Sequence, residues 1–155
     1  RLLEHALREG QDHALEDLFR RLALVYPLRE ILVAYRALTG GRPRQRAQAL
    51  EYLDSALSRA DKTIVLPLID ETTMSQQVRA GAAAFGRPVL SVAEMLRELG
   101  GHPDPWLRAC ALYAIGASAV PGFGDLVERG RRAADEIVAE TAELTHTRLL
   151  EAGVA

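Results

Sequence analysis

Arg46-Ala47-Gln48-Ala49-Leu50 and Arg108-Ala109-Cys110-Ala111-Leu112 repeat one pattern, R-A-x-A-L, at a separation of 62 residues (108 − 46). Half of this separation predicts further copies near positions 77 and 139. Small residues stand at both places, in Gln77-Val78-Arg79-Ala80-Gly81-Ala82 and Val138-Ala139-Glu140-Thr141-Ala142. A step of about 31 residues is the signature of an array of structural repeats, each of which is one supersecondary unit. The sequence therefore predicts a repeat protein.

The composition favours an all-α protein. Hydrophobic residues make up 48% of the 155 residues, aromatic residues only 5%, and no run alternates apolar and polar residues as a half-buried strand does. Glycine and proline punctuate the chain between stretches of helical period. We expect helices at about 1–25 (with an interruption at Gly10 left open), 28–38, 43–58, 61–70, 74–85, 92–99, 105–117, 123–132 and 134–150.

Two helix starts have specific signals. Ser91 followed by Glu94 is a capping box, and Asp104 before Pro105 places a capping carboxylate ahead of a proline at the first helical position. Trp106 follows that proline and is expected either to wedge against the preceding hairpin or to anchor a partner. Asp125 is expected to cap a helix after the Gly122-Phe123-Gly124 turn.

The repeated motif has a packing role. Alanines such as Ala49 and Ala111 allow helices to approach closely, while Leu50 and Leu112 fill the remaining space. The arginines of the motif, Arg46 and Arg108, are expected near the hairpin turns. There a guanidinium bonds a neighbouring carboxylate or the carbonyls at a helix C-terminus. These residues, with Asp104 and Trp106, form the predicted structural ladder.

Charge and cysteine content exclude several classes of function. The chain has 19 Lys+Arg against 21 Asp+Glu, a net charge of -2, so it lacks the positive field that non-specific nucleic-acid binding requires. One cysteine and four histidines do not build a Cys-rich zinc site, and no cofactor is expected. The longest uncharged stretch, 109–124, is too polar and too broken by Gly and Pro to span a bilayer.

The sequence resembles the HEAT-like repeats, in which two antiparallel helices form one unit of an armadillo-like α-solenoid. The residues that carry the resemblance are Asp104 to Leu112 with Ile115-Gly116, and Leu66-Pro67-Leu68-Ile69-Asp70. It implies a single domain, a right-handed α-solenoid of about four hairpins at about 1–38, 43–70, 74–99 and 105–132, with a last helix at about 134–150. Two departures are the irregular 74–85 motif and Ala139 in place of arginine.

More narrowly, 18–27, 34–38 and 46–54 look like a HEAT segment found in large bacterial proteins. Those proteins resemble ADP/ATP-carrier or major-facilitator transporters and are often joined to a cyclic-nucleotide-binding domain. The resemblance implies a cytoplasmic segment of a membrane-bound parent. Arg1 in place of Met, and an apolar face of the last helix without a following partner, are taken as signs of a fragment.

Candidate chemistry is sparse. Glu143 and His146 have an i, i+3 metal-ligand spacing, but a bundle site needs a second such pair and more glutamates. Cys110 lies inside the packing motif, where its counterpart is Gln48, so it is interpreted as a packing residue.

The sequence therefore predicts a non-catalytic protein-interaction module without metal or cofactor. The second helices of the hairpins are expected to line the partner surface, with Lys62, Glu94, Arg97, Glu128, Arg129, Arg131 and Arg132 as its charged residues. Two alternatives stay open. A ligand-binding or enzymatic helical domain would show a convergent polar pocket, and a nucleic-acid-binding repeat protein would show a continuous basic groove.

Overall fold

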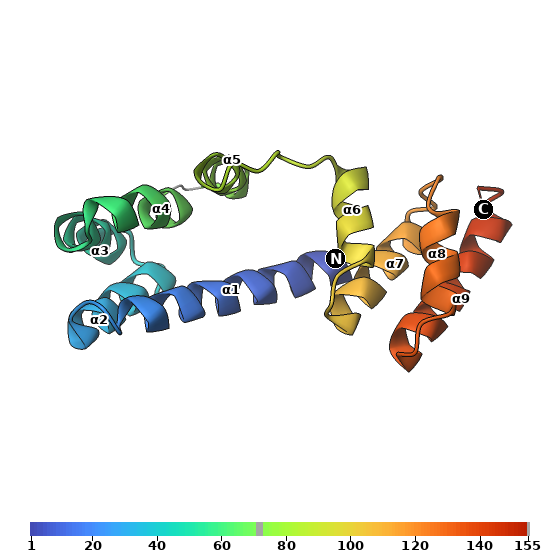
Figure 1. Cartoon of the computed structure of the whole chain (residues 1–155), viewed down its shortest axis with the longest axis horizontal. Helices are drawn as coiled ribbons and strands as arrows, with labels where there is room; N and C mark the ends of the chain where they lie inside the picture. Colours follow the sequence, from blue (N-terminus) through green and yellow to red (C-terminus); the bar gives the residue numbers. More distant parts are fainter. Residues whose placement is uncertain (71–72, 155) are drawn as a thin grey trace. The chain divides into compact units, whose positions relative to one another are not determined.

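The protein is all-α, as predicted. The computed structural model describes residues 1–70 and 73–154, and within these ranges it contains nine helices and no strand (Figure 1). The helices are α1 (Leu2–Leu22), α2 (Leu28–Thr39), α3 (Pro43–Ala56), α4 (Arg59–Ile69), α5 (Met74–Ala84), α6 (Val92–Gly100), α7 (Pro105–Ala117), α8 (Gly124–Arg131) and α9 (Glu136–Glu151). α1 continues through Gly10 without interruption.

The chain forms two compact units. Residues Asp12–Val89 form the first, called the N-terminal unit below, and Arg1–Gln11 together with the chain from Leu90 onward form the C-terminal unit. Each unit has its own cluster of buried apolar side chains.

The N-terminal unit packs its helices in chain order. α2 packs on α3, α3 on α4, and α4 on α5. Ile31 and Leu53 are fully buried in its core, and the Phe19 and Tyr35 rings meet at 5.4 Å between centroids. The buried members of this core are Phe19, Leu22, Ile31, Ala34, Leu38, Ala49, Leu53, Leu57, Val65 and Ile69.

A polar cluster fixes the start of α4. The Ser58 side chain accepts a hydrogen bond from the Asp61 backbone N–H at 3.2 Å and donates one to the Asp61 carboxylate at 2.8 Å. The Tyr26 hydroxyl donates to the same carboxylate and accepts from the Ser58 N–H. These bonds, first the one from Tyr26, hold the pKa of Asp61 below its usual value. Because Ser58 is the cap, α4 begins at Arg59, earlier than the expected position 61.

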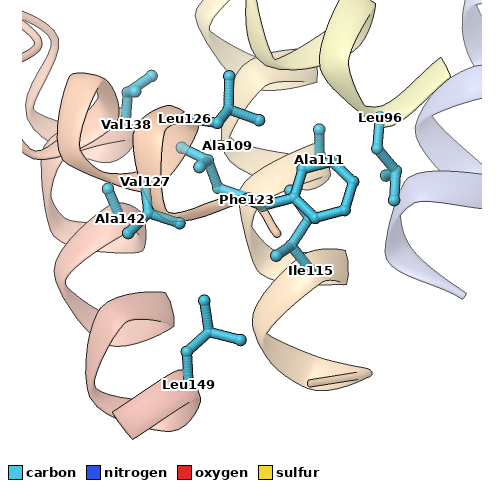
Figure 2. Close-up of a cluster of buried hydrophobic side chains, with 11 residues drawn as sticks. Leu96, Ala109, Ala111, Ile115, Phe123, Leu126, Val127, Val138, Ala142 and Leu149 are labelled. Carbon is cyan, nitrogen blue, oxygen red and sulfur yellow. The ribbon is translucent and has the colours of Figure 1, made fainter. Parts of the chain in front are cut away.

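The C-terminal unit is built around α7, the most apolar helix. α7 packs on α9 and α6, and α9 also packs on α8. Figure 2 shows side chains from these four helices meeting in one cluster, with Ala111 and Ile115 of α7 fully buried. The buried members are Leu96, Ala109, Ala111, Leu112, Ile115, Phe123, Leu126, Val127, Val138, Ala142 and Leu149.

Small residues allow α7, α8 and α9 to approach closely. A Cβ added at Gly116 of α7 would lie 3.0 Å from the Thr145 Cα of α9, and one added at Gly130 of α8 would lie 2.9 Å from the Ala142 Cβ. Thr145 is fully buried, and its hydroxyl donates to the Leu112 carbonyl at 2.9 Å. These close contacts run through Gly116, Gly130 and Thr145. The seam of motif alanines expected between stacked hairpins stays a prediction.

The capping predictions have mixed outcomes. Ser91 and Glu94 form a complete capping box at α6, and the Asp104 carboxylate accepts from the Trp106 N–H at the start of α7, so both predictions are confirmed. The prediction that Asp125 is the N-cap of its helix is wrong. α8 begins at Gly124 with Phe123 at the N-cap position and no side-chain cap, because guanidinium groups bind the Asp125 carboxylate instead.

Candidate interaction groove between α2 and α3

An open groove of about 560 Å³ lies between α2 and α3 in the N-terminal unit. These two helices pack on each other, are neighbours in Figure 1, and are joined by a three-residue turn, Gly40 to Arg42. Gly41 has a φ of 72°, which glycine adopts without strain, and Pro43 starts α3 at a position where its missing N–H costs nothing. The groove is lined by Arg29, Glu30, Val33, Ala34, Arg36, Ala37, Gln45, Gln48, Ala49 and Tyr52.

The groove has an apolar floor and a polar rim. Alanines of α2 and α3 form the floor, and Ala34 and Ala49 there are almost completely buried. Val33 is 59% exposed beside them and adds apolar surface to the groove. Polar side chains surround this apolar surface, and Ala49, predicted from its motif to be a packing residue, is the point where core and groove meet.

The two arginines of the groove are free to bind a partner. Neither Arg29 nor Arg36 has a side-chain hydrogen bond or ion pair with any residue in the described ranges. Both side chains are exposed. The groove therefore offers two cations whose electrostatic attraction is not already satisfied within the protein.

The two arginines of the repeated motif differ in their contacts. Arg46 of α3 donates from Nη2 to the carbonyl of Ile69, the last residue of α4, which is the kind of helix-terminus contact expected for a ladder residue. Its counterpart Arg108 has a buried Nε without a hydrogen-bond partner among the described residues. Trp106 is 46% exposed. The assignment of all these residues to one repeating ladder stays a prediction.

The charged residues of the predicted partner surface have hydrogen-bond or ion-pair partners within the chain. Lys62 pairs with Asp54 at 3.5 Å in the N-terminal unit, and Glu94 belongs to the capping box. Arg97 donates to the Asp125 carboxylate at 3.2 Å and to the Gly122 carbonyl at 2.6 Å, and it lies over the Phe123 ring.

A second set of ion pairs lies along α8, and one of them, Arg131 with Glu143, connects α8 to α9. Arg131 bonds Glu128 at 2.6 Å and Glu143 at 2.5 Å, while Arg129 pairs with Asp125. Arg132 approaches Glu128 at 3.7 Å. Thus the charges predicted to meet a partner are largely neutralised within their own unit.

These ion pairs shift the pKa values of the side chains that form them. The hydrogen bond from Arg97 holds the pKa of Asp125 below its usual value, and the bond from Arg131 does the same for the pKa of Glu128. Glu143 and Glu128 in turn raise the pKa of Arg131. These groups stay charged at neutral pH, as members of a stabilising surface network require.

The side chains considered for catalysis or metal binding do not come together in one site within the described residues. Cys110 is completely buried, and desolvation, with a smaller effect of Asp104, raises the pKa of its thiol. The Glu143 carboxylate of the Glu143/His146 pair is engaged by Arg131. Over residues 1–70 and 73–154, no group of three or more His, Cys, Asp or Glu side chains is placed to hold a metal ion.

The groove residues were not identified from the sequence, although a signal exists. Arg29, Val33 and Arg36 are spaced i, i+4 and i+7, so they share one face of a helix, and that face carries two cations around an exposed valine. The segment 28–50 also holds five arginines and one acidic residue, Glu30, in a chain of near-neutral total charge.

Comparison with protein-family models, with curated proteins and with solved structures finds no match to this chain. The resemblance to HEAT-like repeats and to transporter-associated segments therefore stays a prediction. In the part of the chain that the structure describes, no helix has the length and apolar character needed to cross a membrane.

Proposed function

We propose that the chain is a non-catalytic protein-interaction module and that the α2–α3 groove is where it binds its partner. The observation that carries this proposal is the combination of free Arg29 and Arg36 side chains with an open apolar floor. Interfaces join an apolar centre to a polar rim in this way, and exposed arginine is enriched in them.

The alternatives have less support. A catalytic or ligand-binding domain gathers titratable groups of altered pKa around a pocket. Here the altered carboxylates of Asp125 and Glu128 are bound to arginines in a surface network, and none of the groups with an altered pKa lines the groove.

A peptide-display selection tests the proposal. Random 16-residue peptides are selected on the full chain and then screened on two variants of neighbouring exposed residues of α3. Gln48→Trp places an indole in the groove, whereas Ala47→Trp places one outside it. Binders that tolerate Ala47→Trp and are lost with Gln48→Trp support the proposal. Selected binders that are indifferent to both substitutions, or a selection that enriches none, would refute it.

The arrangement of the helices as a right-handed HEAT-like solenoid is part of the proposal. It is supported within the C-terminal unit by the packing of α7 on α9, since alternate helices of stacked hairpins pack on one another in a solenoid. Packing of α2 on α3 and of α4 on α5 is the contact expected between the second helix of one hairpin and the first of the next.

We propose the cytoplasmic side of a bacterial transporter-like protein as the setting of this module. Only the sequence resemblance supports it, with its expected cyclic-nucleotide-binding neighbour. The coding sequence that flanks this segment tests it. Several apolar stretches of about 20 residues in the same reading frame are expected, and a reading frame without them would contradict the setting.

A further inference from the structure

We infer that the α2–α3 groove binds an acidic amphipathic helix of its protein partner, with two carboxylates seven residues apart on either side of an apolar anchor. This inference rests on the proposed function, because it names the chemistry of the partner at the same groove. It follows from the charge of the groove, the spacing of its two arginines and the small side chains of its floor.

The positive charge of the groove favours a partner with carboxylate side chains. Its rim presents Arg29 and Arg36 without intramolecular partners in the described part of the chain, and Glu30 is the one acidic residue of segment 28–50. By contrast, Arg97 and Arg131 of the C-terminal unit are already held by Asp125, Glu128 and Glu143. Guanidinium groups bind carboxylates through paired hydrogen bonds, so the free pair selects an acidic partner.

The spacing of the two arginines favours a helix of the partner. Arg29 and Arg36 are seven residues apart on one face of α2, which corresponds to about 10 Å along the helix axis at 1.5 Å per residue. Glutamates at positions i and i+7 of a partner helix have the same separation and also share one face. A leucine at i+3 or i+4 then lies opposite Val33, which is 59% exposed between the two arginines.

The floor allows such a helix to approach. Ala34, Ala37 and Ala49 present only methyl groups, and small side chains let two helix backbones come close together. Gln45 and Gln48 of α3 border the opposite side and supply amide donors and acceptors for polar flanks of the partner. The apolar floor favours this ligand over a polyphosphate backbone, because a phosphate chain has no apolar side chain to cover it.

The test uses synthetic fluorescent peptides and the full chain, with binding measured by fluorescence anisotropy at two salt concentrations. The first peptide is a 16-residue helix with the motif Glu-x-x-Leu-Leu-x-x-Glu. The second has the same composition with the glutamates at i and i+5, which rotates one carboxylate about 140° away from the other. The third replaces both glutamates by glutamine. A single-stranded oligonucleotide serves as the fourth ligand.

Two double variants provide the matched comparison. Arg29→Gln with Arg36→Gln removes both groove cations. Arg79→Gln with Arg87→Gln removes the same charge from exposed arginines of the same unit that do not line the groove. Circular dichroism checks that each variant keeps the helical content of the parent.

The inference predicts that the first peptide binds at least about tenfold more tightly than the second and third. The groove double variant should remove this difference, the control double variant should keep it, and added salt should reduce it. If the second peptide binds as tightly as the first, the inferred seven-residue spacing is wrong. If the glutamine peptide binds as tightly, the inferred acidic character of the partner is wrong. Preference for the oligonucleotide would overturn the protein partner. If peptides selected by display bind through the groove but carry no acidic pair, this inference fails while the proposed function stands.

Discussion

Gly116→Ala tests the close packing of the C-terminal unit against a control in the same unit. The new Cβ would lie 3.0 Å from both the Cα and the Oγ1 of Thr145, where ordinary contacts measure 3.4–4 Å. Overpacking of this kind costs about 1–3 kcal/mol, while replacing glycine by alanine inside a helix gains about 1 kcal/mol. Displacement of the Thr145 hydroxyl from its carbonyl acceptor adds about 1 kcal/mol to the cost.

The net expectation is a free energy of unfolding lower by about 1–3 kcal/mol for Gly116→Ala. Gly10→Ala lies in the middle of α1 with nothing within 4 Å of its Cβ, so it should raise stability by about 0.5–1 kcal/mol. Urea unfolding followed by the fluorescence of Trp106, the single tryptophan, measures both. Equal stabilisation by the two substitutions would refute the helix contact at Gly116.

Three further predictions concern the C-terminal unit. Thr145→Val keeps the shape of the buried side chain but removes its hydrogen bond to the Leu112 carbonyl, and urea unfolding should show a loss of about 1 kcal/mol; an unchanged midpoint would contradict the bond. Ala111→Glu places a charge at a position with 0% exposure and should cost about 3 kcal/mol or more, measured in the same way, so a variant as stable as the parent would disprove this burial. The lowered pKa of Asp125 means that its bond to Arg97 contributes stability fully above pH 3.8 and loses it as the pH falls through the lowered pKa. Arg97→Met should therefore weaken the acid dependence of the urea midpoint, and an identical pH profile would rule this linkage out.

Local signals in the sequence were sufficient for the helices and several of their caps. Ser91 and Asp104 act within three residues of themselves, so their capping roles follow from short-range geometry. The alanines of the repeated motif were expected in packed positions, and Ala49 and Ala111 are buried. Helical period, small residues and capping side chains thus define most of the elements.

Long-range partners decide the rest. Arg97 meets Asp125 across 28 positions of sequence, and this contact removed Asp125 from the capping role that its local position suggested. Arg46 and Arg108 share one motif but not one environment, because each contact depends on the helix that packs beside it. An arginine side chain is available to a partner only where no carboxylate or carbonyl of the chain already binds it.

The availability of the groove arginines also depends on long-range packing. Arg29 and Arg36 have an ordinary spacing for an amphipathic helix, and the sequence contains acidic residues that a fold could have placed against them. Only the packing of α2 on α3 leaves both cations exposed beside an alanine floor. The candidate site therefore became visible from the structure, while the charged residues favoured from the sequence formed an internal network.

The central claim, that the α2–α3 groove is the interaction site, is tested most directly by nuclear magnetic resonance. Titration of the ¹⁵N-labelled chain with the Glu-x-x-Leu-Leu-x-x-Glu peptide should move the amide signals of Val33, Ala37 and Gln48 together, as well as the side-chain signals of Arg29 and Arg36. Shifts confined to α8 and α9, or a spectrum unchanged at peptide concentrations that give binding by anisotropy, would contradict the claim.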